Sequence, residues 1–206
     1  MLSPKSPTLP KDCSAVQQAL ASESSLTPRQ KPIENMLPLN ADEVAIYTAV
    51  VQKWISDRPE SLNVSNRTLP LEVTSHSTAL IDCACDSGIS AETLLKASLS
   101  FHRLNPGGLP KEARLVDLEK QSSSVRANDP RNTMGQGKSV EGAVANAFAN
   151  GLFSLSEIAF DNEHKHALLR FSFVCGSLCG SGTTVLFERV GGQWKRNDRT
   201  CGGWVS

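Results

Sequence analysis

The C-terminal part of the chain is a succession of short apolar runs separated by turn residues, and this pattern constrains the fold more than any other feature. The second run places an apolar residue at every other position from Leu169 to Cys175, which is typical of a strand with one buried face. The pair Gly191-Gly192 accepts the positive φ angles of a tight hairpin turn. We therefore expect a four-stranded antiparallel meander. Its strands are Leu155–Phe160, His166–Cys175, Thr183–Arg189 and Gln193–Asn197.

Three segments further upstream carry helix signals. Asn40, followed three residues later by Glu43, forms a capping box, and apolar residues then recur at helical spacing. The expected helices are Ala41–Ser56, Ala91–Arg103 and Val140–Ala149, the last with Ser139 as its N-cap.

Shorter apolar runs predict strands over Ser61–Thr68, Ala79–Cys85 and Ala113–Leu118, and the polar stretch Gln121–Lys138 is expected to be a loop. As a strand, Ala79–Cys85 would point Cys83 and Cys85 to the same face. Helices early and antiparallel strands late indicate the α+β class, with about three helices packed on the C-terminal meander.

Residues 1–38 form a distinct segment that is rich in proline and serine and poor in apolar residues. Such a segment buries too little apolar surface to offset its ordering entropy, so we expect a flexible N-terminal arm. Residues 39–206 are expected to form a single α+β domain.

The charge balance and the distribution of apolar residues argue against a nucleic-acid-binding protein and a membrane-spanning protein. Lysine plus arginine and aspartate plus glutamate number 21 each, so no basic surface indicates nucleic acid. The sequence has no apolar run of the roughly 20 residues that a membrane span needs. The start of the chain also lacks the apolar core of a secretory signal, which fits either a cytosolic protein or a mature exported form.

An even number of cysteines favours the exported form. Six cysteines can form three disulfides, which persist in oxidising compartments. The alternative is six reduced thiols in the cytosol, some of them packed as small apolar groups. The disulfide candidates are Cys13, Cys83, Cys85, Cys175, Cys179 and Cys201.

A resemblance rests on the C-terminal motifs: CGSLCGSG from Cys175 to Gly182, then Gly192-Gln-Trp194, then the terminal Trp204-Val-Ser206. This segment resembles a family of bacterial extracytoplasmic proteins of unknown function. In that family a strand leads into Cys-Gly-x-Leu-Cys-Gly-x-Gly and the chain ends in Trp-x-Ser. The resemblance implies a small exported α+β protein and supplies no catalytic residue.

The pair Cys175 and Cys179 admits three interpretations. The first is structural disulfide bonding, either with each other or with Cys83, Cys85 or Cys201. The second is a zinc site that also uses His164 and His166. The third is a redox-active or nucleophilic thiol, with His164 or His166 as the base.

The stretch Asn132–Ser139 ends in Gly-Lys-Ser, as a phosphate-binding loop does. Asn132 replaces the first glycine of that pattern, and the preceding residues Ser122–Arg131 are too polar for the buried strand it requires. We therefore expect a loop ending in the N-cap Ser139, and no nucleotide site.

These features together favour a non-enzymatic, disulfide-stabilised binding or accessory module that acts outside the cytoplasm, periplasmic or secreted. Its expected partner is a protein or a component of the cell envelope, and nothing in the sequence indicates a cofactor. The two C-terminal tryptophans are expected in the core or, alternatively, in a binding groove. The candidate binding surface is Gly176, Ser177, Leu178, Gly180, Trp194 and Trp204.

Overall fold

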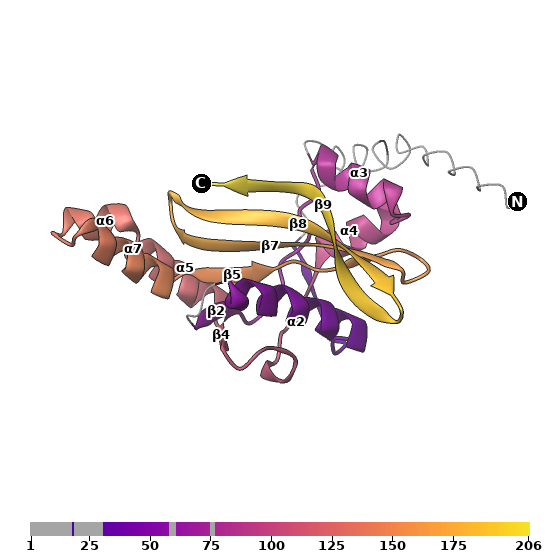
Figure 1. Cartoon of the computed structure of the whole chain (residues 1–206), viewed down its shortest axis with the longest axis horizontal. Coiled ribbons are helices and arrows are strands. Elements are labelled where there is room, and N and C mark those ends of the chain that lie inside the picture. The colour runs from indigo at the N-terminus through magenta and orange to yellow at the C-terminus, as the bar shows by residue number, and fades with distance from the viewer. Residues whose placement is uncertain (1–17, 19–30, 58–60, 75–76) are drawn as a thin grey trace, which may run out of the picture.

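The computed structural model describes residue 18 and residues 31–57, 61–74 and 77–206. The domain is α+β, as predicted, with helices on both faces of a mostly antiparallel sheet (Figure 1). Most of the expected N-terminal arm lies outside the described residues, as does Cys13. Within the last part of that arm, β1 (Ile33–Asn35) pairs in parallel with β3 (Ser100–His102).

The main sheet has seven strands in the order β4-β2-β5-β7-β8-β9, and β6 pairs with β7. The order of the meander is confirmed, because β5, β7, β8 and β9 are antiparallel neighbours. Its first strand is misplaced, because β5 shares only Leu155 with the predicted range Leu155–Phe160, whose last two residues form β6. On the other side, β2 pairs in parallel with both β4 and β5. The bounds are β2 Leu62–Ser65, β4 Ala113–Val116, β5 Leu152–Leu155, β6 Ala159–Phe160, β7 His166–Gly176, β8 Cys179–Val190 and β9 Gln193–Val205.

The turn between β8 and β9 is the predicted one. Gly191 and Gly192 have φ angles of 60° and 80°, so both adopt the left-handed conformation that a primed hairpin turn requires. The turn sets a register in which Arg189 lies opposite Trp194.

Side chains along β7 point alternately to the two faces of the sheet, so β7 contributes to two separate apolar clusters. Leu169 and Phe173 face a cluster that includes Tyr47 and Val51 of α2 (Ala41–Ser56). Leu168 faces the opposite cluster, formed with α3 (Thr78–Asp86) and α4 (Ala91–Leu99). Figure 1 shows α2 on one side of the sheet and α3 and α4 on the other. The sheet therefore forms the middle layer of the domain.

Helix α2 begins as predicted. The Asn40 side chain accepts hydrogen bonds from the N–H groups of Asp42 and Glu43, each at 2.9 Å. The Glu43 carboxylate in turn accepts the Asn40 N–H at 2.7 Å, which completes the capping box.

The strand predicted over Ala79–Cys85 is wrong, because this segment is helix α3. Helical spacing stacks Leu80 on Ala84 and Ile81 on Cys85, and all four are buried. Cys83 and Cys85 therefore do not share one face, since two helical positions are about 200° apart.

The loop predicted over Gln121–Lys138 is also wrong, because it contains most of α5 (Leu118–Ala127) and all of α6 (Pro130–Gly135). Asp117 and Asp129 cap these helices, so their N-termini form despite a polar sequence. Helix α7 (Val140–Ala149) was predicted correctly.

The second predicted helix ends earlier than expected. Helix α4 stops at Leu99, and Ser100–His102 become β3 because β1 offers a backbone to pair with. A single 3₁₀ turn, η1 (Pro106–Gly108), follows. Among the described residues, no helix is both long and apolar enough to cross a bilayer.

Candidate functional site

Cys175 and Cys179 are joined to each other by a disulfide that closes the tip of the β7–β8 hairpin. Their Cα atoms are 5.1 Å apart, and Gly176 pairs with Cys179 across the hairpin. Cys175 is buried, with 1% of its surface exposed. Of the three interpretations of this pair, the structure shows the first, a structural disulfide, formed between the two cysteines themselves.

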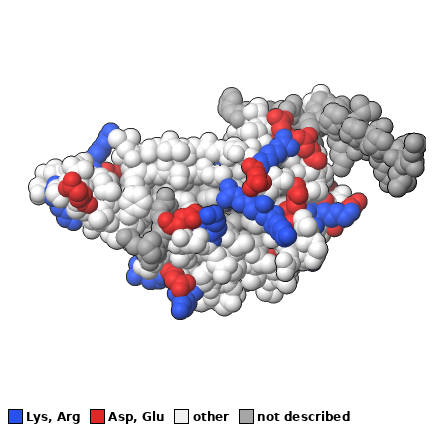
Figure 2. Space-filling view, viewed as in Figure 1, with Lys and Arg blue, Asp and Glu red and all other residues white. Residues whose placement is uncertain are grey.

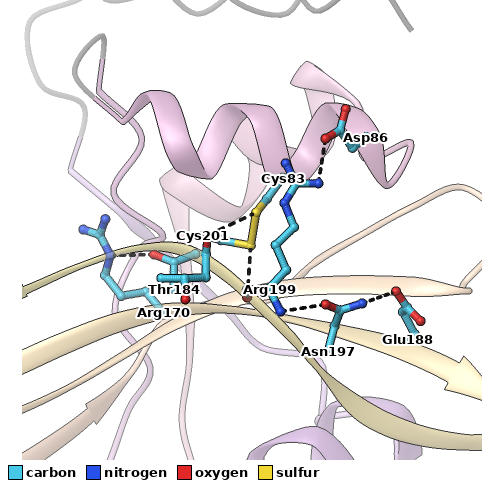
Figure 3. The surroundings of a disulfide bond; sticks show 9 residues. Cys83, Asp86, Arg170, Thr184, Glu188, Asn197, Arg199 and Cys201 are labelled. Carbon is cyan, nitrogen blue, oxygen red and sulfur yellow. Dashed lines mark hydrogen bonds and ion pairs between the residues drawn. A yellow bond between two sulfur atoms is a disulfide. The ribbon is translucent and has the colours of Figure 1, made fainter. Parts of the chain in front are cut away.

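A second disulfide joins Cys83 of α3 to Cys201 of β9, with 5.7 Å between the Cα atoms (Figure 3). The two residues are 118 positions apart, so the bond fastens an early helix to the last strand. Beside it, Arg199 forms an ion pair with Asp86 at 2.6 Å. Cys85, also a candidate, is buried on α3.

The tip of the hairpin rests on the N-terminus of α6. Asp129 caps that helix by accepting the Arg131 N–H at 2.9 Å, and its second oxygen accepts the Ser177 N–H at 2.6 Å. The Ser177 N–H is the main cause that lowers the pKa of Asp129, and Arg131 adds to it. A Cβ at Gly176 would lie 2.8 Å from Pro130 Cδ, so this contact requires glycine.

Trp204 lies against glycines of β8. A Cβ at Gly182 would overlap the indole Nε1, and one at Gly180 would meet the ring at 3.1 Å. Trp204 is 40% exposed, and Leu178 at the hairpin tip is 65% exposed. We call Leu178, Gly180, Gly182 and Trp204 the hairpin surface.

The hairpin surface is free of charge. Residues 171–187 and 200–206 contain no Asp, Glu, Lys or Arg. In Figure 2 the region around the start of β8 and the end of β9 is white, whereas acidic and basic side chains gather toward the other ends of these strands. Burying these segments against a partner would therefore desolvate no charged side chain of their own, and the Asp129 carboxylate beside Ser177 is already buried and hydrogen-bonded.

Trp194 was also predicted to belong to the binding surface, but it lies far from the hairpin surface. It pairs with Arg189 near the opposite hairpin, its ring lies 5.7 Å from that of Phe160, and Arg189 stands over it. Ten positions of β9 separate it from Trp204, about 33 Å along a strand. The structure thus does not bring the two tryptophans into one groove.

The histidines proposed as zinc ligands or as a base are also distant. His166 pairs with Glu188 at one end of β7, whereas Gly176 pairs with Cys179 at the other. The ten steps between them span about 33 Å, and His164 lies beyond His166. The Cys₂His₂ set is not assembled, and the described residues contain no cluster of three or more metal-ligating side chains.

His164 and His166 instead belong to the turn before β7. His166 Nδ1 lies 3.3 Å from Asp161, and the His164 ring stacks on Phe160 at 4.9 Å. Burial raises the pKa of Asp161, but hydrogen bonds from the N–H groups of His166 and Lys165 outweigh it, so the pKa is lowered. These interactions stabilise the turn.

Sequence reasoning missed a buried, hydrogen-bonded pair between His102 of β3 and Glu157. His102 Nδ1 lies 2.8 Å from a Glu157 carboxylate oxygen, and the residues are 5% and 4% exposed. The Glu157 carboxylate also accepts the His102 N–H at 2.9 Å and the Thr68 hydroxyl. No local motif signals this pair, since 55 positions separate its members.

The phosphate-loop resemblance has no counterpart in the fold. Ser139 caps α7 by accepting the Gly142 N–H at 3.1 Å, as predicted. The segment before it is helix α6 rather than a buried strand.

Comparison of the chain with protein-family models, with curated proteins and with solved structures finds no match. Function is therefore inferred from the geometry of the chain itself.

Proposed function

We propose that the protein is a disulfide-stabilised binding or accessory module that acts outside the cytoplasm and contacts a partner through the hairpin surface. The observation that carries the proposal is Trp204, a large aromatic residue that lies 40% exposed over two glycines of an uncharged sheet end. Tryptophan is among the residues that contribute most binding energy to protein interfaces.

The surface has rigid support. The Cys175–Cys179 bond fixes the hairpin tip, and Asp129 holds its backbone against α6. The Cys83–Cys201 bond anchors β9 three residues before Trp204. Because these contacts order the surface before binding, less conformational entropy is lost when a partner docks.

The chemistry of the surface favours a partner protein over nucleic acid or an anionic membrane. Interface centres are depleted in charged residues and enriched in aromatic ones, and segments 171–187 and 200–206 follow that pattern. The matching partner face presents apolar side chains and backbone polar groups. Such a partner is an exported protein or a protein of the cell envelope.

The cysteine chemistry supports the proposed compartment. Disulfides persist in secreted and periplasmic proteins and are rare where thiols are kept reduced. Two disulfides in one small domain, together with the resemblance to exported bacterial proteins, support an extracytoplasmic location.

Site-specific photocrosslinking tests the proposal. A photoreactive residue replaces Leu178 at the hairpin tip, or Val190 at the opposite end of β8 as a matched control. Both are exposed aliphatic residues, 65% and 49% respectively. The protein is expressed with export in its own host and irradiated in intact cells.

We expect one discrete crosslinked protein from position 178 and none from position 190. That product should disappear when Trp204→Ala is added. Equal crosslinking from both positions, or none from position 178, would count against the hairpin surface as the contact site.

A further inference from the structure

Strand β9 forms one edge of the seven-stranded sheet, and none of the described strands pairs with its outer side. In Figure 1 the last part of β9, marked C, lies at the border of the sheet, with no labelled element beyond it. An edge strand presents backbone N–H and C=O groups to its surroundings. Because Trp204 belongs to β9, the hairpin surface ends at this edge.

The hydrogen bonds to β8 show which residues of β9 point these groups outward. The Ser206 N–H donates to the Gly180 carbonyl at 3.0 Å. In an antiparallel pair, residues alternate between exchanging hydrogen bonds with the neighbouring strand and pointing their polar groups away from it. Trp204 is therefore bonded to β8, whereas Gly203 and Val205 direct their N–H and C=O groups to the outer side.

The outer side of this segment is accessible and ordered. Gly203 and Val205 are both exposed, and Val205 exposes 88% of its surface. The Cys83–Cys201 disulfide fastens the strand two residues before Gly203, and the bond to Gly180 holds its end. A partner backbone would therefore meet a strand that is already in place, which reduces the entropy lost on binding.

The first part of β9 is protected against such pairing. β8 advances by two residues from Val185 to Phe187, whereas β9 advances by four, from Arg196 to Thr200, so this part of β9 bulges. Four charged side chains lie here: Lys195, Arg196, Asp198 and Arg199. Bulges and charges are features by which edge strands avoid pairing with other chains. Residues 203–205 have neither, since they are uncharged and their pairing with β8 is continuous.

The opposite edge of the sheet, β4, is protected as well. It has only four residues, and the charged Arg114 is one of them. Short strands and charged side chains both disfavour the addition of a further strand. Of the two edges of the described sheet, the end of β9 is therefore the open one.

We propose that the partner of the hairpin surface binds by strand addition: an extended, uncharged segment of the partner pairs with residues 203–205 of β9 and places an apolar side chain against Trp204. In this mode main-chain hydrogen bonds supply affinity, and alternate side chains supply specificity. An apolar side chain fits because cross-strand pairs with aromatic residues stabilise a sheet, and segment 200–206 carries no charge. This inference rests on the proposed function and adds how the partner is recognised.

The first measurement uses the full-length protein without a partner. Amide hydrogen exchange followed by NMR should show a Trp204 N–H that exchanges at least about tenfold more slowly than those of Gly203 and Val205. A Val205 N–H as protected as that of Trp204 would overturn the proposal, because its donor would already be engaged within the domain.

Two variants at one position then test strand addition in the presence of the partner. Val205→Pro removes the outward N–H without removing a bond to β8, whereas Val205→Thr keeps the N–H and the β-branched shape and is the matched control. Each is combined with the photoreactive residue at position 178 in intact cells. We expect Val205→Pro to lower the yield of the crosslinked product at least about fivefold and Val205→Thr to leave it unchanged.

The outcomes separate this proposal from the proposed function. An undiminished product in Val205→Pro, together with its loss in Trp204→Ala, would overturn strand addition and leave the proposed function standing. Equal losses in Val205→Pro and Val205→Thr would also overturn strand addition, because the side chain rather than the N–H would then be needed.

Two further results concern the occupant of the edge. A crosslinked product made of two copies of this chain would overturn the proposal, because a second copy rather than another protein would pair with β9. No product from position 178 in the otherwise unchanged protein would remove the proposed function, and strand addition with it.

Discussion

The carboxylate of Asp129 joins two parts of the fold, because it caps α6 with one oxygen and accepts the Ser177 N–H at 2.6 Å with the other. Ser177 lies inside the ring that the Cys175–Cys179 disulfide closes. The tip of the β7–β8 hairpin is therefore tied to a helix by a single side chain.

Asp129→Ala should destabilise the protein by about 1–2 kcal/mol, because it removes a helix cap and leaves the Ser177 N–H without its acceptor. Asp198→Ala, an exposed aspartate on β9, is the control and should change the free energy of unfolding by less than about 0.5 kcal/mol. Urea unfolding measures both. Equal effects would mean that the Asp129 contact contributes nothing specific.

The same carboxylate gives stability a pH dependence. Its pKa is lowered in the fold, so its contribution is fully present above the ordinary aspartate pKa of about 4 and is lost as the pH falls through the lowered value. The stability difference between the wild type and Asp129→Asn should therefore be constant near pH 6–7 and shrink toward about pH 3. A difference that grows on acidification would contradict this assignment.

The two disulfides should contribute unequally. The Cys83–Cys201 bond spans 118 positions and should contribute about 5 kcal/mol by chain entropy, whereas the short Cys175–Cys179 ring should contribute about 2 kcal/mol. Urea unfolding of the two double alanine variants measures the difference. The ranking would be wrong if loss of the short ring cost more.

Gly182→Ala should displace Trp204, since the added Cβ would overlap its Nε1. We expect a loss of about 1–3 kcal/mol from overpacking and a changed indole N–H signal in the NMR spectrum. Gly135→Ala is the matched control, because a Cβ added there would have no neighbour within 4 Å, and it should be neutral or slightly stabilising. An unmoved Trp204 signal in Gly182→Ala would argue against the packing described.

The buried His102–Glu157 pair should outweigh an exposed ion pair. Glu157→Ala leaves the His102 ring and the Thr68 hydroxyl buried without their shared acceptor and should cost about 3–5 kcal/mol. Glu34→Ala breaks the 2.7 Å contact to Arg103, whose side chain is 67% exposed, and should change the free energy of unfolding far less because solvent screens this pair. Similar losses in the two variants would show that the His102–Glu157 pair is not desolvated as described.

The sequence predicted those elements whose signals are local. The Asn40–Glu43 capping box, the Gly191-Gly192 turn and the alternation along β7 each depend on residues close together in the chain, and all are present. Ala79–Cys85 failed because a short apolar run fits a strand or a buried helix equally well. Helices α5 and α6 were missed because their apolar content is low, although Asp117 and the pair Asp129-Pro130 are helix-start signals.

Whether a candidate site could be predicted likewise depends on whether its residues lie close together in the chain. The Cys175–Cys179 bond and the loop it closes lie within one motif, so the sequence could point to them. The His102–Glu157 pair, by contrast, is formed by tertiary folding from two segments that no periodicity connects. The separation of His164 and His166 from the cysteines depends on the full length of β7, which only the strand register reveals.

Cysteine mapping tests directly whether the hairpin surface is held by structural disulfides. Protein purified from its native host without reductant is alkylated, digested and analysed by mass spectrometry. We predict linked peptides joining Cys175 to Cys179 and Cys83 to Cys201, with none of the four alkylated. Free alkylation of Cys175 and Cys179, or linkage of either to Cys83 or Cys201, would be incompatible with a hairpin surface held in this way.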